Sequence, residues 1–121
     1  RQLEETHTME NIIFNELKIR GFNVDIGVVV VNGRGKDGSS VRKQYEIDFV
    51  CNKGSKRYYI QSAYAIPDQA KMEQEQRSLM TGDAFKKIII TKDAPAPYYN
   101  ESGVLIMSIF EFMLNPDSLE Q

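Results

Sequence analysis

A β-hairpin in the middle of the chain constrains the fold more than any other feature of the sequence. Residues 45–51 alternate in polarity, which is the period of a half-buried strand. Their apolar face comprises Tyr45, Ile47, Phe49 and Cys51, and their other face comprises Glu46, Asp48 and Val50. Residues 52–55 are typical of a tight turn, and residues 56–64 are expected to return as a second strand. We therefore expect an antiparallel hairpin inside a sheet.

A helix is expected before this hairpin, over residues 8–20. Its apolar side chains recur at helical spacing and are Met9, Ile12, Ile13 and Leu17. Thr8 has the hydroxyl that an N-cap needs, and Gly21 can adopt the left-handed conformation that ends a helix. The apolar stripe predicts that one face of this helix is buried.

Residues 22–31 are predicted to form a strand. The four valines at 28–31 make it apolar on both faces, which is typical of a strand that is covered on both sides. Residues 32–40 are expected to be a loop. This loop contains G-x-G-x-x-G from Gly33 to Gly38, but a dinucleotide site needs a helix next, and the following segment is predicted to be a strand. A hairpin loop is therefore the favoured interpretation.

The second half of the chain predicts a helix, two strands and a helical turn. The helix is expected over residues 67–80, beginning at Pro67 and ending at Gly82, and its polar composition indicates a peripheral position. The remaining segments comprise a strand at 86–91, a loop at 94–99, a strand at 104–107 and a helical turn at 109–114. We expect an α/β fold in which a mixed sheet is flanked by helices in three layers.

Length and composition limit the class of protein further. The 121 residues fit a single domain, and the net charge of −2 argues against a protein that coats polyanions. A single cysteine excludes an intrachain disulfide framework and suits a reducing cytoplasm. No apolar run approaches the ~20 residues of a membrane helix, so no membrane partner is expected. Because the chain opens at Arg1 without an initiator Met or a signal peptide, we interpret it as a piece of a longer protein or as a protein whose tag has been removed.

Positive charge gathers between residues 34 and 57, where there are seven cations and three acids. The cations are Arg34, Lys36, Arg42, Lys43, Lys53, Lys56 and Arg57. On loops and strand ends these side chains can contact phosphates, so nucleic acid is one candidate partner. Solvated loops are also commonly rich in Lys and Arg, which is the simpler interpretation.

Three oxygen-bearing side chains form a candidate metal site. Glu10 lies on the first predicted helix, Asp48 on the outgoing hairpin strand and Gln61 on the return strand. Oxygen ligands from a helix and two neighbouring strands are what a magnesium site for phosphodiester hydrolysis requires. A lysine normally completes such a site by stabilising the developing charge. Scattered acids occur in any α/β protein, so the residue pattern leaves a magnesium site and a solvated surface both open.

The order and spacing of these segments resemble the PD-(D/E)xK, or restriction-endonuclease-like, fold. The segments that carry the resemblance are Glu10-Asn11, Glu16-Leu17, Gly21-Phe22, residues 46–50 and Tyr59-Ile60-Gln61. More closely, residues 8–114 resemble the C-terminal domain of unknown function of a group of prokaryotic AAA-type ATPases. The resemblance implies an αβββαβ core in which Glu10 and Asp48 match two metal ligands. It also implies that an ATPase domain of the same parent chain is the partner.

The third motif of that fold is altered in this chain. Gln61-Ser62-Ala63 stands where the family has E-x-K. A Gln oxygen can still ligate a metal but carries no charge, and Ala63 offers neither a charge nor a donor. Lys71 on the following helix is the candidate replacement for the lysine.

We therefore expect residues 1–121 to form a degenerate, non-catalytic accessory domain of a cytoplasmic ATPase, without a cofactor, that binds a protein partner or nucleic acid. One alternative is a magnesium-dependent nuclease that uses Glu10, Asp48, Gln61 and Lys71. A second alternative is an oligomerisation domain.

Overall fold

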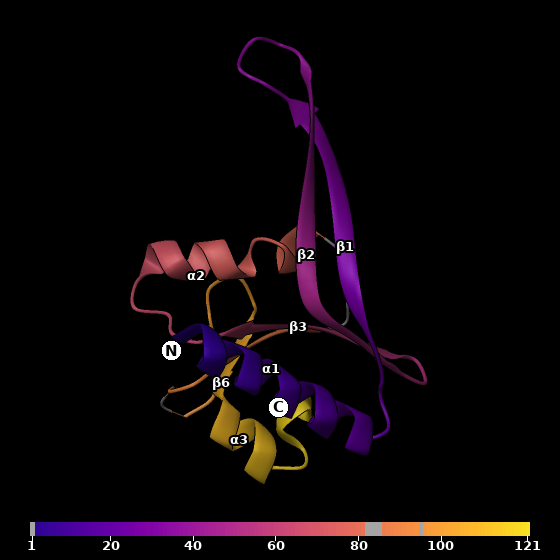
Figure 1. Ribbon diagram of the computed structural model, residues 1–121, viewed down its shortest axis with the longest axis vertical. Helices are drawn as coiled ribbons and strands as arrows, with labels where there is room; N and C mark the ends of the chain where they lie inside the picture. Colours follow the sequence, from indigo (N-terminus) through magenta and orange to yellow (C-terminus); the bar gives the residue numbers. More distant parts are fainter. Residues whose placement is uncertain (1, 82–85, 95) are drawn as a thin grey trace.

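The computed structural model describes residues 2–81, 86–94 and 96–121. Its elements are α1 (Gln2–Ile19), β1 (Asn23–Arg34), β2 (Ser40–Lys53), β3 (Lys56–Ala63), α2 (Gln69–Gln76), the 3₁₀ turn η1 (Leu79–Thr81), β4 (Lys86–Thr91), β5 (Tyr98–Tyr99), β6 (Leu105–Ser108), α3 (Ile109–Leu114) and the 3₁₀ turn η2 (Ser118–Glu120). In this part of the chain the strands form one sheet in the order β1-β2-β3-β4-β6-β5 (Figure 1). β1 to β3 are antiparallel, β4 and β6 run parallel to β3, and β5 is antiparallel to β6.

Helices cover both faces of this mixed sheet. α1 and α3 pack on one face, where Ile13, Leu17 and Phe112 are fully buried against the strands. The other face is covered by α2 and η1 through Met72 and Leu79. The predicted α/β class, with a mixed sheet between helices, is confirmed. No helix in the described ranges is long and apolar enough to cross a membrane.

α1 begins earlier than the sequence predicts and ends where it predicts. Thr8 is not the N-cap, because the preceding residues are themselves good helix formers and the helix already begins at Gln2. The Thr8 hydroxyl instead donates to the Glu4 carbonyl at 2.9 Å. At the other end Gly21 has a φ of 91°, and the Phe22 amide donates to the Leu17 carbonyl at 3.1 Å. This pattern closes a helix with a left-handed glycine.

The prediction that the first strand is covered on both sides is wrong. Ile26, Val28 and Val30 are 70%, 60% and 38% exposed. β1 lies at the edge of the sheet, and β3 pairs with β2 only from Phe49 to Lys53. The remainder of the β1–β2 hairpin therefore extends beyond the sheet (Figure 1). Residues 28–46, from the Val28–Glu46 pair to the tip, are named the hairpin arm.

The predicted loop at residues 32–40 is also shorter than expected. Pairing continues to Arg34 opposite Ser40, so only residues 35–39 form the turn. The Gly35 amide donates to the Ser39 carbonyl at 2.7 Å, as a hairpin turn requires. Strand follows the glycine-rich segment rather than helix, which confirms the hairpin interpretation of the G-x-G-x-x-G motif.

A β-bulge interrupts the alternation of β2. Asp25 pairs with Val50 and Gly27 pairs with Ile47, so two residues of β2 lie opposite Ile26 alone. As a result Ile47 packs in the cluster on the α2 face, whereas Phe49 packs in the cluster on the α1 face. The prediction that Ile47 and Phe49 share one face is wrong, because the extra residue shifts the side-chain period by one.

Downstream of the hairpin the element order is as predicted, with some boundaries displaced. α2 is capped by Asp68, whose carboxylate accepts from the Lys71 amide at 2.9 Å, so Pro67 lies just outside the helix. Met72 is its buried residue, which confirms the peripheral position. The bounds of β4 and α3 are confirmed. β6 begins one residue later than expected, and the predicted loop at 94–99 contains β5; the predicted stop at Gly82 lies outside the described residues.

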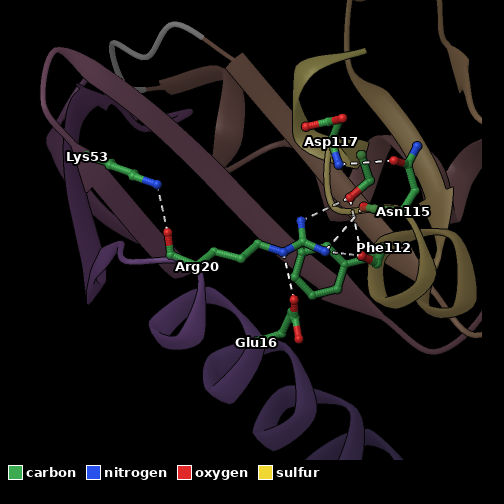
Figure 2. Close-up of polar contacts among 7 residues, drawn as sticks. Glu16, Arg20, Lys53, Phe112, Asn115 and Asp117 are labelled. Atoms are coloured by element: carbon green, nitrogen blue, oxygen red, sulfur yellow. Dashed lines mark hydrogen bonds and ion pairs between the residues drawn. The ribbon is translucent and has the colours of Figure 1, made fainter.

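Arg20 connects the end of α1 to the C-terminal part of the chain (Figure 2). Its Nε donates to Glu16 Oε2 at 2.8 Å and its Nη1 donates to Ser118 Oγ at 3.1 Å. Nη2 donates to the carbonyl oxygens of Phe112 and Asn115. The guanidinium carbon lies 4.5 Å from the centre of the Phe112 ring. Four hydrogen bonds and one ring contact therefore hold this cation, whose side chain is only 11% exposed.

Two further contacts extend this network (Figure 2). Lys53, the last residue of β2 before the β2–β3 turn, donates from Nζ to the Arg20 carbonyl at 2.8 Å, and its Nζ lies 5.5 Å from the centre of the Phe22 ring. The Asp117 amide donates to Asn115 Oδ1 at 3.0 Å and holds the chain between α3 and η2. The end of α1, the β2–β3 turn and the C-terminus therefore share one set of hydrogen bonds.

Replacing Arg20 by alanine should lower the free energy of unfolding by about 3 kcal/mol, because the part-buried Glu16 carboxylate loses its cation and the carbonyls of Phe112 and Asn115 each lose one hydrogen bond. Urea unfolding followed by circular dichroism measures this change. Arg57→Ala is the control, since it removes an exposed arginine that donates only to Asn52 among the contacts described; its effect should stay within about 0.5 kcal/mol. Equal losses in the two variants would contradict the role of Arg20.

Gly27→Ala tests the packing beside the bulge. A Cβ at this position would lie 2.5 Å from Val50 Cγ2, so the variant should lose about 1–3 kcal/mol of stability. Gly33→Ala is the matched control on the same strand, because a Cβ there meets no heavy atom within 4 Å. The same urea titration should separate the two variants, and a Gly27→Ala protein as stable as Gly33→Ala would show that the bulge is not closely packed.

Candidate functional site

An acidic groove of about 440 Å³ lies between α1 and the base of the β1–β2 hairpin. Among the residues that the structure describes, the charged ones that line it are acids: Glu10, Asp25, Glu46 and Asp48. Its other lining residues are Asn11, Phe14, Val24, Ile26 and Phe49. α1 supplies one wall because its buried stripe fixes it on the sheet, and the bulged part of β2 supplies the floor. We call this feature the acidic groove.

Two hydrogen bonds connect Asp48 to β3, one to the Gln61 side chain and one from the Ser62 amide. The Asp48 amide donates to Gln61 Oε1 at 2.7 Å, and the Ser62 amide donates to Asp48 Oδ2 at 2.9 Å. These bonds come immediately after the Phe49–Ile60 pair, which is the last pair between β2 and β3. The two side chains therefore replace main-chain partners at the point where β2 separates from β3.

The Asp48 carboxyl has an unusual proton affinity. Burial raises its pKa from 3.8 to about 6, and the hydrogen bond from the Ser62 amide opposes this rise. The negative charges of Glu10, Glu75 and Glu46 raise it further. Asp48 is thus a partly buried acid surrounded by other acids, an environment that favours either a proton or a cation at this carboxylate.

The structure brings some of the predicted metal-site residues together. Glu10 and Asp48 line the same groove, and Gln61 contacts Asp48 through its side-chain oxygen. Lys71 instead forms an ion pair with Glu75, one turn further along α2, at 3.3 Å. Within the described ranges, no three Asp, Glu, His or Cys side chains are arranged so that they could hold a metal ion.

Three residues at this site were missed in the sequence analysis. Asp25 and Glu46 line the groove beside the predicted acids. Ser62 is 8% exposed, and its Oγ has no hydrogen-bond partner in the described part of the chain. The pairing register of β1 with β2 brings Asp25 and Glu46 to the groove. The bulge shifts this register, and the alternation of polar and apolar residues in the sequence does not predict that shift.

The predicted basic residues do not form one patch. Arg34, Lys36, Arg42 and Lys43 lie at the tip of the hairpin arm, whereas Lys53, Lys56 and Arg57 lie at the β2–β3 turn. β2 has 14 residues, so these groups are separated by roughly 40 Å at about 3.3 Å per residue. The second group is also engaged within the protein, since Lys56 pairs with Glu120 at 3.4 Å and Lys53 donates to Arg20.

Comparison with known proteins finds a related sequence. The chain is 29% identical over 109 residues to an uncharacterized protein of Haemophilus influenzae, and the alignment covers 88% of this chain and 22% of that protein. The chain thus spans about a fifth of the length of this relative. No family model matches the sequence, and no solved structure matches the fold.

The raised pKa of Asp48 predicts how stability depends on pH. The folded state holds the proton more tightly than the unfolded chain, so the protonated acid contributes stability fully below pH 3.8, and this contribution is lost as the pH rises through about 6. The shift corresponds to about 3 kcal/mol. Asp48→Asn keeps an oxygen for the Ser62 amide and cannot titrate, so urea unfolding between pH 4 and 8 should show a flatter profile.

Asp48→Ala provides the comparison for this experiment. It should lose the same pH dependence, but it should be less stable than Asp48→Asn at every pH, by about 1–3 kcal/mol, because the Ser62 amide loses its acceptor. A wild-type profile in Asp48→Asn would show that another group is responsible for the titration.

Proposed function

We propose that this chain is a non-catalytic, nuclease-like accessory module that binds a partner within a larger AAA-type ATPase. The order of its elements supports a restriction-endonuclease-like core. α1, the antiparallel strands β1 to β3, α2 and the parallel strand β4 follow one another along the chain. This is the αβββαβ order that the resemblance implies, and β3 and β4 are neighbours in the sheet.

The surroundings of Gln61 carry the proposal of a non-catalytic role. Its side-chain oxygen, the atom that a metal would use, already accepts from the Asp48 amide at 2.7 Å. Two residues further, Ala63 is 3% exposed and packs in one cluster with Met72 and Leu79. The strand position where the resemblance implies a lysine therefore supplies an apolar contact and no charge.

The chemistry of phosphodiester hydrolysis makes this difference important. The attacking water must be oriented or deprotonated, and the pentavalent phosphate needs positive charge beside the metal. Losing one such electrostatic contact costs ~10²–10³ in rate. The charged residues that line the groove are acids, and they repel a phosphate when no cation is bound. These features favour a module that binds a partner over an enzyme that hydrolyses phosphodiesters.

The proposed partner is the ATPase domain of the same parent chain, in the cytoplasm. The Haemophilus influenzae relative supports a module carried by a larger protein, because the aligned segment is 22% of its length. Nucleic acid is a second candidate partner. The four cations at the tip of the hairpin arm favour it, since they are close together in the turn and the adjoining strand ends.

A magnesium-dependent nuclease is the alternative function. Glu10 and Asp48 line one groove, and the raised pKa of Asp48 marks a carboxylate among acids that a divalent cation would stabilise. Glu10, Asp48 and Gln61 would be its ligands, and Lys71 would supply the positive charge. The fit is incomplete, because Gln61 is hydrogen-bonded to the Asp48 amide and Lys71 is paired with Glu75.

A cleavage assay distinguishes the two functions. Single-stranded, duplex and branched DNA and RNA are incubated with the protein in Mg²⁺ or Mn²⁺, and we expect no cutting. Asp48→Ala, Lys71→Ala and the exposed control Glu73→Ala are assayed in parallel. Cutting that disappears in Asp48→Ala and Lys71→Ala but persists in Glu73→Ala would replace the proposal with the nuclease.

Calorimetric titration with the same two ions provides an independent test. We expect little heat, because two carboxylates and an occupied Gln61 make a poor site for a divalent ion. Micromolar binding that Asp48→Ala abolishes would contradict this expectation. Binding of nucleic acid without cutting, lost by about 0.2 M salt, would identify the basic tip as the contact surface.

A further inference from the structure

β1 presents an unprotected edge of the sheet. It is a strand of 12 residues, and within the described ranges its outer side has no strand partner. Natural proteins protect such edges by keeping them short or by placing lysine, proline or a bulge on them. From Ile26 to Gly33 the strand contains no charged residue and no proline, and its bulge lies on β2 instead. The outer main-chain groups of β1 are therefore a template for another strand.

The same strand carries an exposed apolar strip. Ile26, Val28 and Val30 occupy alternate positions, so they share one face of the strand, and they are 70%, 60% and 38% exposed. The opposite face at Gly27 is the packed one, because a Cβ there would meet Val50 and Ile47. Single exposed apolar residues are common, but a row of three along an unpaired edge indicates an interaction surface.

The two ends of this strip differ in charge. At its base lies the acidic groove with Glu10, Asp25, Glu46 and Asp48. At its tip lie Arg34, Lys36, Arg42 and Lys43, and the one acid in this turn, Asp37, accepts from the amide and hydroxyl of Ser39. The hairpin therefore has a negative base, an apolar middle and a positive tip.

We infer that two copies of this chain pair edge to edge through their β1 strands, antiparallel about a two-fold axis, and join their sheets. The axis that fits the strip passes through Val29. It places Val28 opposite Val30 of the second copy, so the two apolar strips lie side by side. It also places Arg34 of the second copy opposite Val24, a residue that lines the acidic groove.

Charge identifies a second copy, rather than an unrelated segment, as the occupant. In the two-fold arrangement each positive tip lies at the negative base of the other copy, and both ends of the interface are complementary. A parallel arrangement would bring tip to tip and base to base, with like charges together. An antiparallel second copy of the hairpin therefore matches the first copy both in its apolar strip and in the charges at its two ends.

Sedimentation velocity of the full chain tests this inference. We expect a species of twice 13.9 kDa that dissociates on dilution. Val28→Lys should raise the dissociation constant roughly tenfold or more, because it places a charge in the apolar middle of the interface. Leu114→Lys is the matched control, since Leu114 is 81% exposed on α3, and it should dimerise like the wild type. Circular dichroism checks that both variants fold.

A charge-exchange experiment tests the register. Arg34→Glu should dimerise weakly, and so should the double variant Asp25→Lys, Glu46→Lys, because each reverses charges on one side of the contact and weakens the complementarity at both ends of its own dimer. A mixture of the two should recover a mixed dimer in which both ends are complementary. Failure of the mixture to recover would overturn the proposed register.

Three other outcomes would overturn the pairing itself. The first is a chain that stays monomeric up to millimolar concentration. The second is a dimer that Leu114→Lys breaks and Val28→Lys leaves intact. The third is a monomer that binds an extended peptide of another protein along β1, which would assign the edge to a foreign strand. None of these outcomes bears on cleavage, so this test and the test of the proposed function fail independently.

Discussion

The guanidinium of Arg20 is the contact on which much of the architecture depends. It is largely buried, and a buried cation needs an opposite charge and hydrogen-bond acceptors around it. Those donors reach α1, α3 and η2 at once, and Lys53 adds the β2–β3 turn through the Arg20 carbonyl. Because this network holds the C-terminal end of α1, the apolar stripe can position the rest of that helix against β1 and β3. The helical wall of the acidic groove follows from this placement.

The bulge in β2 divides the hairpin into two parts with different surroundings. On one side of it Phe49 and Cys51 enter the core beneath α1. On the other side the hairpin arm leaves the sheet, and the side chains of Asp48 and Gln61 satisfy the amides where the strands separate. Asp48, whose pKa is raised by burial, lies in this bulge and lines the acidic groove, and the edge strand β1 continues past it into the hairpin arm. The candidate site and the proposed dimer surface therefore lie next to each other on the hairpin.

Charge is distributed along the hairpin in a way that bears on both proposals. The groove at the base gathers acids, and the cations that could have neutralised them lie at the tip or are engaged elsewhere, as Lys71 is by Glu75. An acidic site without a nearby cation is unfavourable for a phosphate and favourable for a positively charged partner. A partner that brings arginine to the groove would meet this requirement, whether it is a second copy or another domain of the parent chain.

The sequence by itself determined the elements whose physics is local. The helical spacing of Met9 and Leu17, the stop at Gly21, the turn at Gly54 and the β-branched run of β4 all predict structures that the fold contains. These patterns depend on residues that are close together in the sequence, so they predict local structure without knowledge of the tertiary contacts. The four-valine run was equally clear as a strand, and its secondary structure was predicted correctly.

Which of these elements are covered, and which side chains meet, depends on how the strands are ordered and paired in the sheet. Burial of β1 depends on its place in the sheet order, and the positions of Asp48 and Gln61 depend on the bulge and on a strand register set across the hairpin. The sheet order and the strand register both arise from pairings between residues that are distant in the chain. An apolar strand has the same sequence pattern at an edge of a sheet as in its interior. The sequence and its resemblance placed Glu10 and Asp48 in one site, but the exposed strip and the positions of Asp25 and Glu46 in the acidic groove could not be predicted, because each is a relation between strands rather than a property of one.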